Sequence, residues 1–178
     1  HWYRQAAEQG LPSAQYHLGQ LYDSGSGIAQ DVEQAAVWYR KAAEQGYALA
    51  QKNLGLMYAN GSGVPQDDKE AAAWYRKAAE QKLPQAQFNI GTLYFYGYGV
   101  EKNLREALTW FRLAAAQKLR EAEYMMGLAH FEGQGVRHFV DHQSASSSPI
   151  AELIRRYPIK SQNVIAHIRK ATQGEVSL

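Results

Sequence analysis

Apolar residues recur along this chain at spacings of three and four, the pattern of an amphipathic helix. One stretch places four apolar side chains on one helical face: Ala14, Leu18, Leu21 and Tyr22. A second stretch has the same spacing over five positions: Ala35, Trp38, Tyr39, Ala42 and Ala43. The sequence Gly25-x-Gly27 between them favours a helix end and a turn. The pattern therefore predicts two antiparallel helices joined by a glycine-containing loop.

The same pair of stretches returns at a fixed interval. The nonapeptide Trp38-Tyr-Arg-Lys-Ala-Ala-Glu-Gln-Gly46 has near-copies that begin at Trp2, Trp74 and Trp110, which gives a period of 36 residues. A period in this range is typical of a solenoid, in which each unit packs on its neighbours and the stacked units present a broad surface for binding.

The repeat sets the expected boundaries. We expect a lone second helix over 1–10, three helix pairs over 11–46, 47–82 and 83–118, and a fourth first helix over 119–132. Three polar residues stand where helix N-caps are expected: Asp31, Asp67 and Asn103. The predicted fold is all-α, an α-solenoid of antiparallel helix hairpins over residues 1–137 with a short non-repeat tail over 138–178.

The frame Ala14-x3-Leu18-Gly19-x-Leu21-Tyr22-x2-Gly25-x-Gly27, followed by the nonapeptide, resembles the Sel-1-like repeat, a relative of the tetratricopeptide repeat. The resemblance implies an adaptor that assembles protein complexes, frequently bacterial and often periplasmic or secreted, without catalysis. Because the chain opens inside a repeat at His1, we expect it to be a piece whose start is missing. No signal peptide can then be read, and the compartment stays open.

The positions that vary between units are the candidates for binding, because the repeated positions are needed for packing. We expect the first helix of each unit to line a concave face that binds a protein or peptide. Its candidate residues are Tyr16, Gln20, Lys52, Leu56, Phe88, Thr92, Tyr96 and Tyr124. Four aromatic residues would form an exposed patch toward the C-terminal half: Phe88, Phe95, Tyr96 and Tyr124. The alternative is that these rings contact the neighbouring helix or the tail.

Composition removes several classes of function. The chain has no cysteine, which excludes disulfides, thiolate zinc sites and cysteine nucleophiles. Residues 1–137 contain 14 basic and 14 acidic residues, a balance that disfavours binding to nucleic acid. No apolar run approaches the roughly 18–20 residues of a membrane span. His138, Asp141 and His142 have a spacing that zinc can use, but without a third ligand we interpret them as a solvated loop. We expect no metal and no cofactor.

The tail does not continue the repeat, since Ser146 stands where the next tryptophan is due. We expect a helix over about 149–157 and a strand over about 163–170. The segment contains Tyr157-Pro-Ile-Lys-Ser161 and Val164-Ile-Ala-His-Ile-Arg169. Through these and other residues it resembles an internal piece of a class II glutamine amidotransferase domain. The resemblance implies that Arg169 holds the glutamine carboxylate and that Thr172 lies in the same pocket.

That family uses an N-terminal cysteine nucleophile, and this chain has no cysteine. We therefore interpret the tail as a non-catalytic fragment that caps the last repeat. Two alternatives stay open at this point. One is a remnant or fusion that binds or hydrolyses glutamine, and the other is a carbohydrate-binding solenoid.

Overall fold

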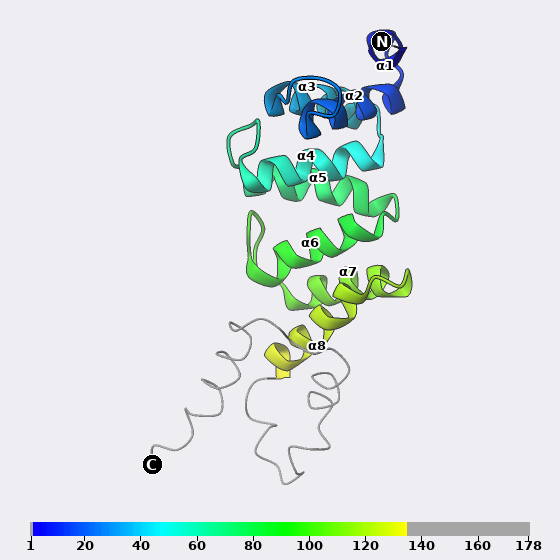
Figure 1. Cartoon of the computed structure of the whole chain (residues 1–178). Helices are drawn as coiled ribbons and strands as arrows, with labels where there is room; N and C mark the ends of the chain where they lie inside the picture. Colours follow the sequence, from blue (N-terminus) through cyan, green and yellow to red (C-terminus); the bar gives the residue numbers. More distant parts are fainter. Residues whose placement is uncertain (1, 135–178) are drawn as a thin grey trace. The chain divides into compact units, whose positions relative to one another are not determined.

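The computed structural model of the chain describes residues 2–134 (Figure 1). Within this range it has eight α-helices and no β-strand. Their bounds are α1 Trp2–Glu8, α2 Pro12–Ser24, α3 Val32–Glu44, α4 Ala48–Asn60, α5 Asp68–Glu80, α6 Pro84–Tyr96, α7 Leu104–Ala116 and α8 Arg120–Gln134. The predicted helix pairs and their order are confirmed.

The helices alternate between two types, which we call first helices (α2, α4, α6 and α8) and second helices (α1, α3, α5 and α7). Helices that follow one another in the chain pack side by side, from α1 on α2 through α6 on α7. The first compact unit spans His1–Glu123, and the rest of α8 belongs to a second unit. The predicted α-solenoid of helix hairpins is therefore confirmed.

The second helices begin at the predicted N-caps. The Asp31 side chain accepts a hydrogen bond from the Gln34 backbone N–H at 2.9 Å. Asp67 and Asn103 each accept two such bonds from the first turn of their own helix. Because these donors have no partner within the helix, a short polar acceptor at this point satisfies them and fixes where the helix starts.

Each hairpin closes around an aromatic ring that lies against a glycine. A Cβ atom on Gly19 would lie 2.7 Å from the Tyr39 ring, and one on Gly55 would lie 2.8 Å from the Tyr75 ring. Gly91 has the same relation to Phe111. Burial raises the pKa of the Tyr75 phenol to about 12, and a hydrogen bond with Asn89 lowers it in part. Glycine is thus required in the middle of these helices by packing, at a cost in helix propensity.

Buried glutamines join each unit to the next. Gln51 is only 4% exposed. Its Nε2 donates to the Ala43 carbonyl at 3.0 Å, and its Oε1 accepts a hydrogen bond from Gln81 Nε2 at 2.8 Å. The same arrangement recurs one unit earlier, where Gln15 donates to the Ala7 carbonyl and accepts from Gln45. It recurs one unit later, where Gln87 donates to the Ala79 carbonyl and accepts from Gln117. We call these three sets the glutamine ladder. It gives a carbonyl near the end of α1, α3 and α5 a second donor, in addition to a backbone N–H of the following turn.

The second glycine of the loop between hairpin helices lies against the preceding unit. Gly63 has a φ of 69° in the left-handed region, and a Cβ there would lie 2.2 Å from the Val32 carbonyl oxygen. Gly99 is equally close to the Asp68 carbonyl oxygen, at 2.1 Å. Val32 and Asp68 are the first residues of α3 and α5, so each loop rests on the start of the previous second helix.

The expected helix over 149–157 and strand over 163–170 lie outside the described residues. The same holds for His138, Asp141 and His142. The boundary expected at residue 137 stays a prediction.

Candidate partner-binding surface

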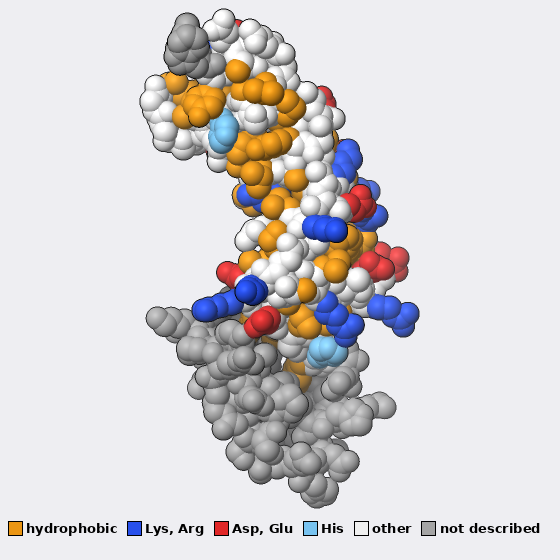
Figure 2. Space-filling model, turned by 90° about the vertical axis from the view of Figure 1, so that its right-hand side faces the viewer, with side chains coloured by type: hydrophobic (Ala, Val, Ile, Leu, Met, Phe, Trp, Pro, Cys, Tyr) orange, Lys and Arg blue, Asp and Glu red, His pale blue; other side chains and the backbone are white. Residues whose placement is uncertain are grey.

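From α2 to α7 the two types of helix differ sharply in charge. Across α2, α4 and α6 the only Lys, Arg, Asp or Glu residues are Asp23 and Lys52. In contrast α3, α5 and α7 carry four, six and three such residues. Figure 2 shows charged side chains mainly along one side of the helices, beside a surface that is mainly hydrophobic or uncharged. Helices α2, α4 and α6 therefore present a less charged surface than α3, α5 and α7, and we call this surface the first-helix face.

Two aromatic residues predicted for this face, Tyr16 on α2 and Phe88 on α6, pack against other rings of the fold. Tyr16 is buried, at 7% exposure, and its ring lies 5.8 Å from that of Tyr39 and 5.2 Å from that of Tyr47. Phe88 is half-buried, and its ring lies 5.8 Å from that of Phe111. Both aromatic side chains thus hold a hairpin together, and the alternative that they contact a neighbouring helix is the one the geometry favours.

The equivalent position in α4 is Lys52, and the side chains beside it on this helix are exposed. Lys52 is half-buried, and burial lowers the pKa of its amine below the ordinary value. Leu49 and Leu56 stand three residues before it and four residues after it, at 37% and 44% exposure. Residues at these spacings share one side of a helix. We call Leu49, Lys52 and Leu56 the α4 strip.

The predicted positions equivalent to Leu56 are Gln20 on α2 and Thr92 on α6. Gln20 is exposed, and its Oε1 lies 3.0 Å from His17 Nδ1. Thr92 is half-buried, and its hydroxyl donates to the Phe88 carbonyl at 2.9 Å within its own helix. The side chains at this position therefore differ between units, as expected of a surface that the fold leaves free.

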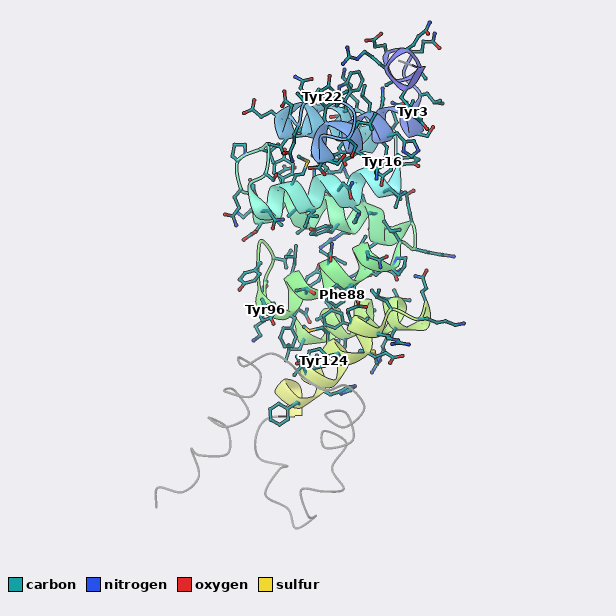
Figure 3. The ribbon with its side chains drawn as sticks, viewed as in Figure 1. Tyr3, Tyr16, Tyr22, Phe88, Tyr96 and Tyr124 are labelled. Carbon is teal, nitrogen blue, oxygen red and sulfur yellow. The ribbon has the colours of Figure 1, made fainter. Side chains whose placement is uncertain are left out.

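The predicted aromatic patch is wrong about Phe95, and it omits Tyr98, which stacks on Tyr96. Phe95 is buried, at 6% exposure, because it turns toward the interior, whereas the adjacent Tyr96 is 50% exposed. The Tyr96 ring stacks on that of Tyr98 at 5.5 Å, and Tyr98 is 53% exposed. Tyr96 lies at the loop end of α6, away from Phe88 (Figure 3). The structure thus pairs Tyr96 with Tyr98 instead of with Phe88.

Sequence reasoning missed Tyr98, although a signal was present. Tyr98 stands between the glycines of its loop, where the other units have Ser26 and Ser62. Comparison of that single position across units would have found it. Tyr124 is half-buried and opens the second compact unit, so its membership of the surface stays a prediction. Arg169 and Thr172 lie outside the described residues.

Within residues 2–134 there is no candidate membrane span and no candidate metal site. No helix in that range is long and apolar enough to cross a membrane. No group of three or more His, Cys, Asp or Glu residues in that range is arranged to hold a metal ion.

Comparison with protein families assigns the repeat. The family model described as Sel1 repeat matches residues 1–11, 12–47 and 48–83; the first range contains α1, and each of the other two contains one observed helix pair. Residues 1–83 thus match the Sel1 repeat. The later helices α6 and α7 reproduce the glycine contact, the N-cap and the glutamine ladder of the Sel1 units, so the Sel1 architecture continues beyond the matched range.

Solved structures agree with a Sel1 solenoid. The chain is 48% identical to c5321, described as a protective antigen of uropathogenic Escherichia coli with an SLR fold, over 74% of this chain and 28% of that one, with a TM-score of 0.71. It is also 48% identical to a Sel1 repeat protein from Oxalobacter formigenes, over 67% and 49% of the two chains, with a TM-score of 0.65. Cysteine rich protein B of Helicobacter pylori is 25% identical over 68% and 86%, with a TM-score of 0.54.

A second family matches the other end of the chain. The model for class-II glutamine amidotransferases matches residues 98–178. A Haemophilus influenzae protein named as a candidate glutamine amidotransferase is 70% identical over 43 residues, which are 24% of this chain and 15% of that protein. The Escherichia coli protein YafJ, named in the same way, is 57% identical over 42 residues, or 24% and 16%. The chain thus spans about 15% of the length of these curated relatives.

The amidotransferase match overlaps helices that have Sel1 geometry. Residues 98–116 include α7, which starts at the Asn103 cap and packs Phe111 against Gly91. These contacts are the same ones that α3 and α5 make in the Sel1 units. The architecture of α7 is therefore that of the repeat.

Proposed function

We propose that the chain is a non-catalytic scaffold that binds a protein or peptide partner on the first-helix face. The observation that carries this proposal is the exposed, nearly uncharged surface of α2, α4 and α6, in which Leu49 and Leu56 are left open. Apolar surface that folding leaves uncovered, next to polar surroundings, is typical of an interaction site. That this face is concave stays a prediction.

The framework of the repeat supports this assignment by exclusion. The recurring aromatic residues of the second helices, among them Tyr39, Tyr75 and Phe111, are almost fully buried. The glutamines of the ladder form hydrogen bonds with backbone carbonyls and with one another. The rings and the buried glutamines of the ladder, Gln15, Gln51 and Gln87, are not free to contact a partner, so we assign binding to the positions that change from unit to unit.

Leu56→Asp should lower the affinity of the chain for its partner by about tenfold or more, because a charge would be buried against apolar partner atoms. The measurement is a titration with a peptide selected on the wild-type chain from a displayed library of random 12-residue peptides. Leu56 is a cleaner test site than Phe88, whose ring also packs on Phe111.

Val37→Asp is the matched control. Val37 lies on α3 and is 44% exposed, the same fraction as Leu56, so the two aspartates perturb folding to a similar extent. The Val37 variant should keep wild-type affinity. Equal loss in both variants, or no loss in either, would count against the first-helix face as the binding surface.

The amidotransferase match favours a second candidate, a segment that binds glutamine through Arg169 and Thr172. Because this chain contains no cysteine, it supplies no thiolate for a covalent thioester mechanism. We expect the chain to release no ammonia from glutamine, measured by a coupled ammonia assay together with calorimetry. Heat of binding without ammonia would support glutamine binding alone, and ammonia release would contradict the non-catalytic assignment.

A further inference from the structure

The α4 strip is not required by the fold. In α2 the positions of Leu49, Lys52 and Leu56 are filled by Ser13, Tyr16 and Gln20, and in α6 they are filled by Gln85, Phe88 and Thr92. All three helices have the same length of 13 residues and the same glycine contact with the second helix. The architecture therefore forms without the two exposed leucines and without the lysine.

Lys52 is the only Lys or Arg on α2, α4 and α6, and α4 carries no Asp or Glu. Among the described residues no carboxylate pairs with its ammonium, and burial alone lowers the pKa of this amine. Asp23, the other charged residue on these helices, lies within hydrogen-bond distance of the Tyr39 hydroxyl at 3.4 Å. A partly desolvated cation without a counter-ion is poised to gain from an incoming anion, since the cost of removing its water is already partly met.

The spacing along α4 restricts what can fit. Seven residues separate Leu49 from Leu56, which corresponds to about 10 Å along the helix axis. Lys52 stands between them, about 4–5 Å from the level of Leu49. In an extended peptide, side chains two residues apart lie on the same face at about 7 Å, and those four apart at about 13 Å. A segment with an aliphatic residue, a carboxylate and a second aliphatic residue at alternate positions would turn all three side chains toward the strip.

We propose that the α4 strip binds an extended partner segment in which one Asp or Glu stands between two aliphatic residues, with the carboxylate paired to the Lys52 ammonium. Charge complementarity carries the choice of occupant, because the strip offers one unpaired cation within an apolar surface. This proposal rests on the proposed function and names the partner chemistry of that same face.

The test is a pair of selections with the displayed library of random 12-residue peptides, one on the wild-type chain and one on Lys52→Met. Methionine keeps an unbranched apolar stem, and because the equivalent positions hold Tyr16 and Phe88 the variant should fold. Peptides from the wild-type selection should be enriched in Asp or Glu flanked by aliphatic residues. Peptides from the Lys52→Met selection should keep the aliphatic pair and lose the acidic preference.

Affinities of one selected peptide then complete the test. It should bind Lys52→Met about tenfold more weakly than wild type and should retain most of its affinity for Lys52→Arg. Changing its acid to the matching amide should cost the same factor on wild type and nothing further on Lys52→Met. Equal affinity for wild type and Lys52→Met, or no acidic enrichment, would overturn the inference.

The two proposals fail in different ways. Peptides that lose affinity on Leu56→Asp but not on Lys52→Met would overturn the carboxylate pairing and leave the first-helix face intact. Selected peptides that bind Leu56→Asp as well as wild type would overturn the proposed face itself, and the pairing at Lys52 with it.

Discussion

Replacing Gly63 by alanine should lower the free energy of unfolding by about 3–4 kcal/mol, from left-handed backbone strain and overpacking together. The backbone at Gly63 has a φ of 69°, which disfavours any Cβ. The added methyl carbon would also lie 2.2 Å from the Val32 carbonyl oxygen, so the loop must move off the first turn of α3. Urea unfolding followed by circular dichroism measures the loss.

Gly27→Ala separates the two causes. Gly27 occupies the same loop position one unit earlier, with a φ of 79°, but nothing lies within 4 Å of the Cβ it would gain. Only the backbone strain then applies, and the expected loss is about 1–2 kcal/mol. Similar losses in both variants would show that the contact between loop and preceding helix contributes little.

Gln51→Met should lower the free energy of unfolding by about 2–3 kcal/mol, although the side chain keeps almost the same volume. The substitution removes the hydrogen bond to the Ala43 carbonyl and the acceptor for Gln81, in a site that is only 4% exposed. The Ala43 carbonyl keeps the Gly46 N–H as a donor at 3.0 Å, so the expected loss is that of two hydrogen bonds, each worth about 0.5–1.5 kcal/mol. Urea unfolding of the variant and of wild type, under identical conditions, measures the difference.

Gln81→Met is the control for the glutamine ladder. Gln81 is exposed, and the substitution leaves the hydrogen bond from Gln51 to the Ala43 carbonyl in place. The expected loss is below about 1 kcal/mol. If Gln51→Met lowered the free energy of unfolding no more than Gln81→Met does, the hydrogen bonds of the ladder would not be a source of stability.

The fold could be predicted from sequence because its determinants are local and repeated. Asp31, Asp67 and Asn103 act as N-caps through hydrogen bonds to residues two or three positions away, and such contacts depend on little beyond the helix start. The period of 36 residues then fixed the order of the helices, since each unit meets the same neighbour in the same way.

The surface was harder to predict because exposure depends on residues of other units. Tyr16 is covered by Tyr47, which belongs to the turn before α4 and is not part of the pattern that marks a first helix. Phe95 and Tyr96 are neighbours in sequence, yet one is buried and the other exposed. Periodicity places such residues on a face but does not say where the adjacent helix stops covering it.

The glutamine ladder was missed for a related reason. Gln15, Gln51 and Gln87 recur at each period, but a polar residue beside a core alanine reads as a surface residue. Each of these glutamines is buried where its amide donates to a backbone carbonyl eight residues earlier, and only the turn between units brings the two groups close. Recurrence of an amide at a strict period is the signal that could have indicated a structural role.

The side-by-side packing of helices that are consecutive in the chain has a kinetic consequence. From α1 on α2 to α6 on α7, each such contact is closed by a short connection, and the loop contacts of Gly63 and Gly99 reach back by only about one unit. The entropy of closing a loop grows with its length, so no step in folding must join distant parts of the chain. Any hairpin can serve as a starting point from which structure spreads in both directions. The time needed to form each contact therefore does not depend on how many units stand beside it.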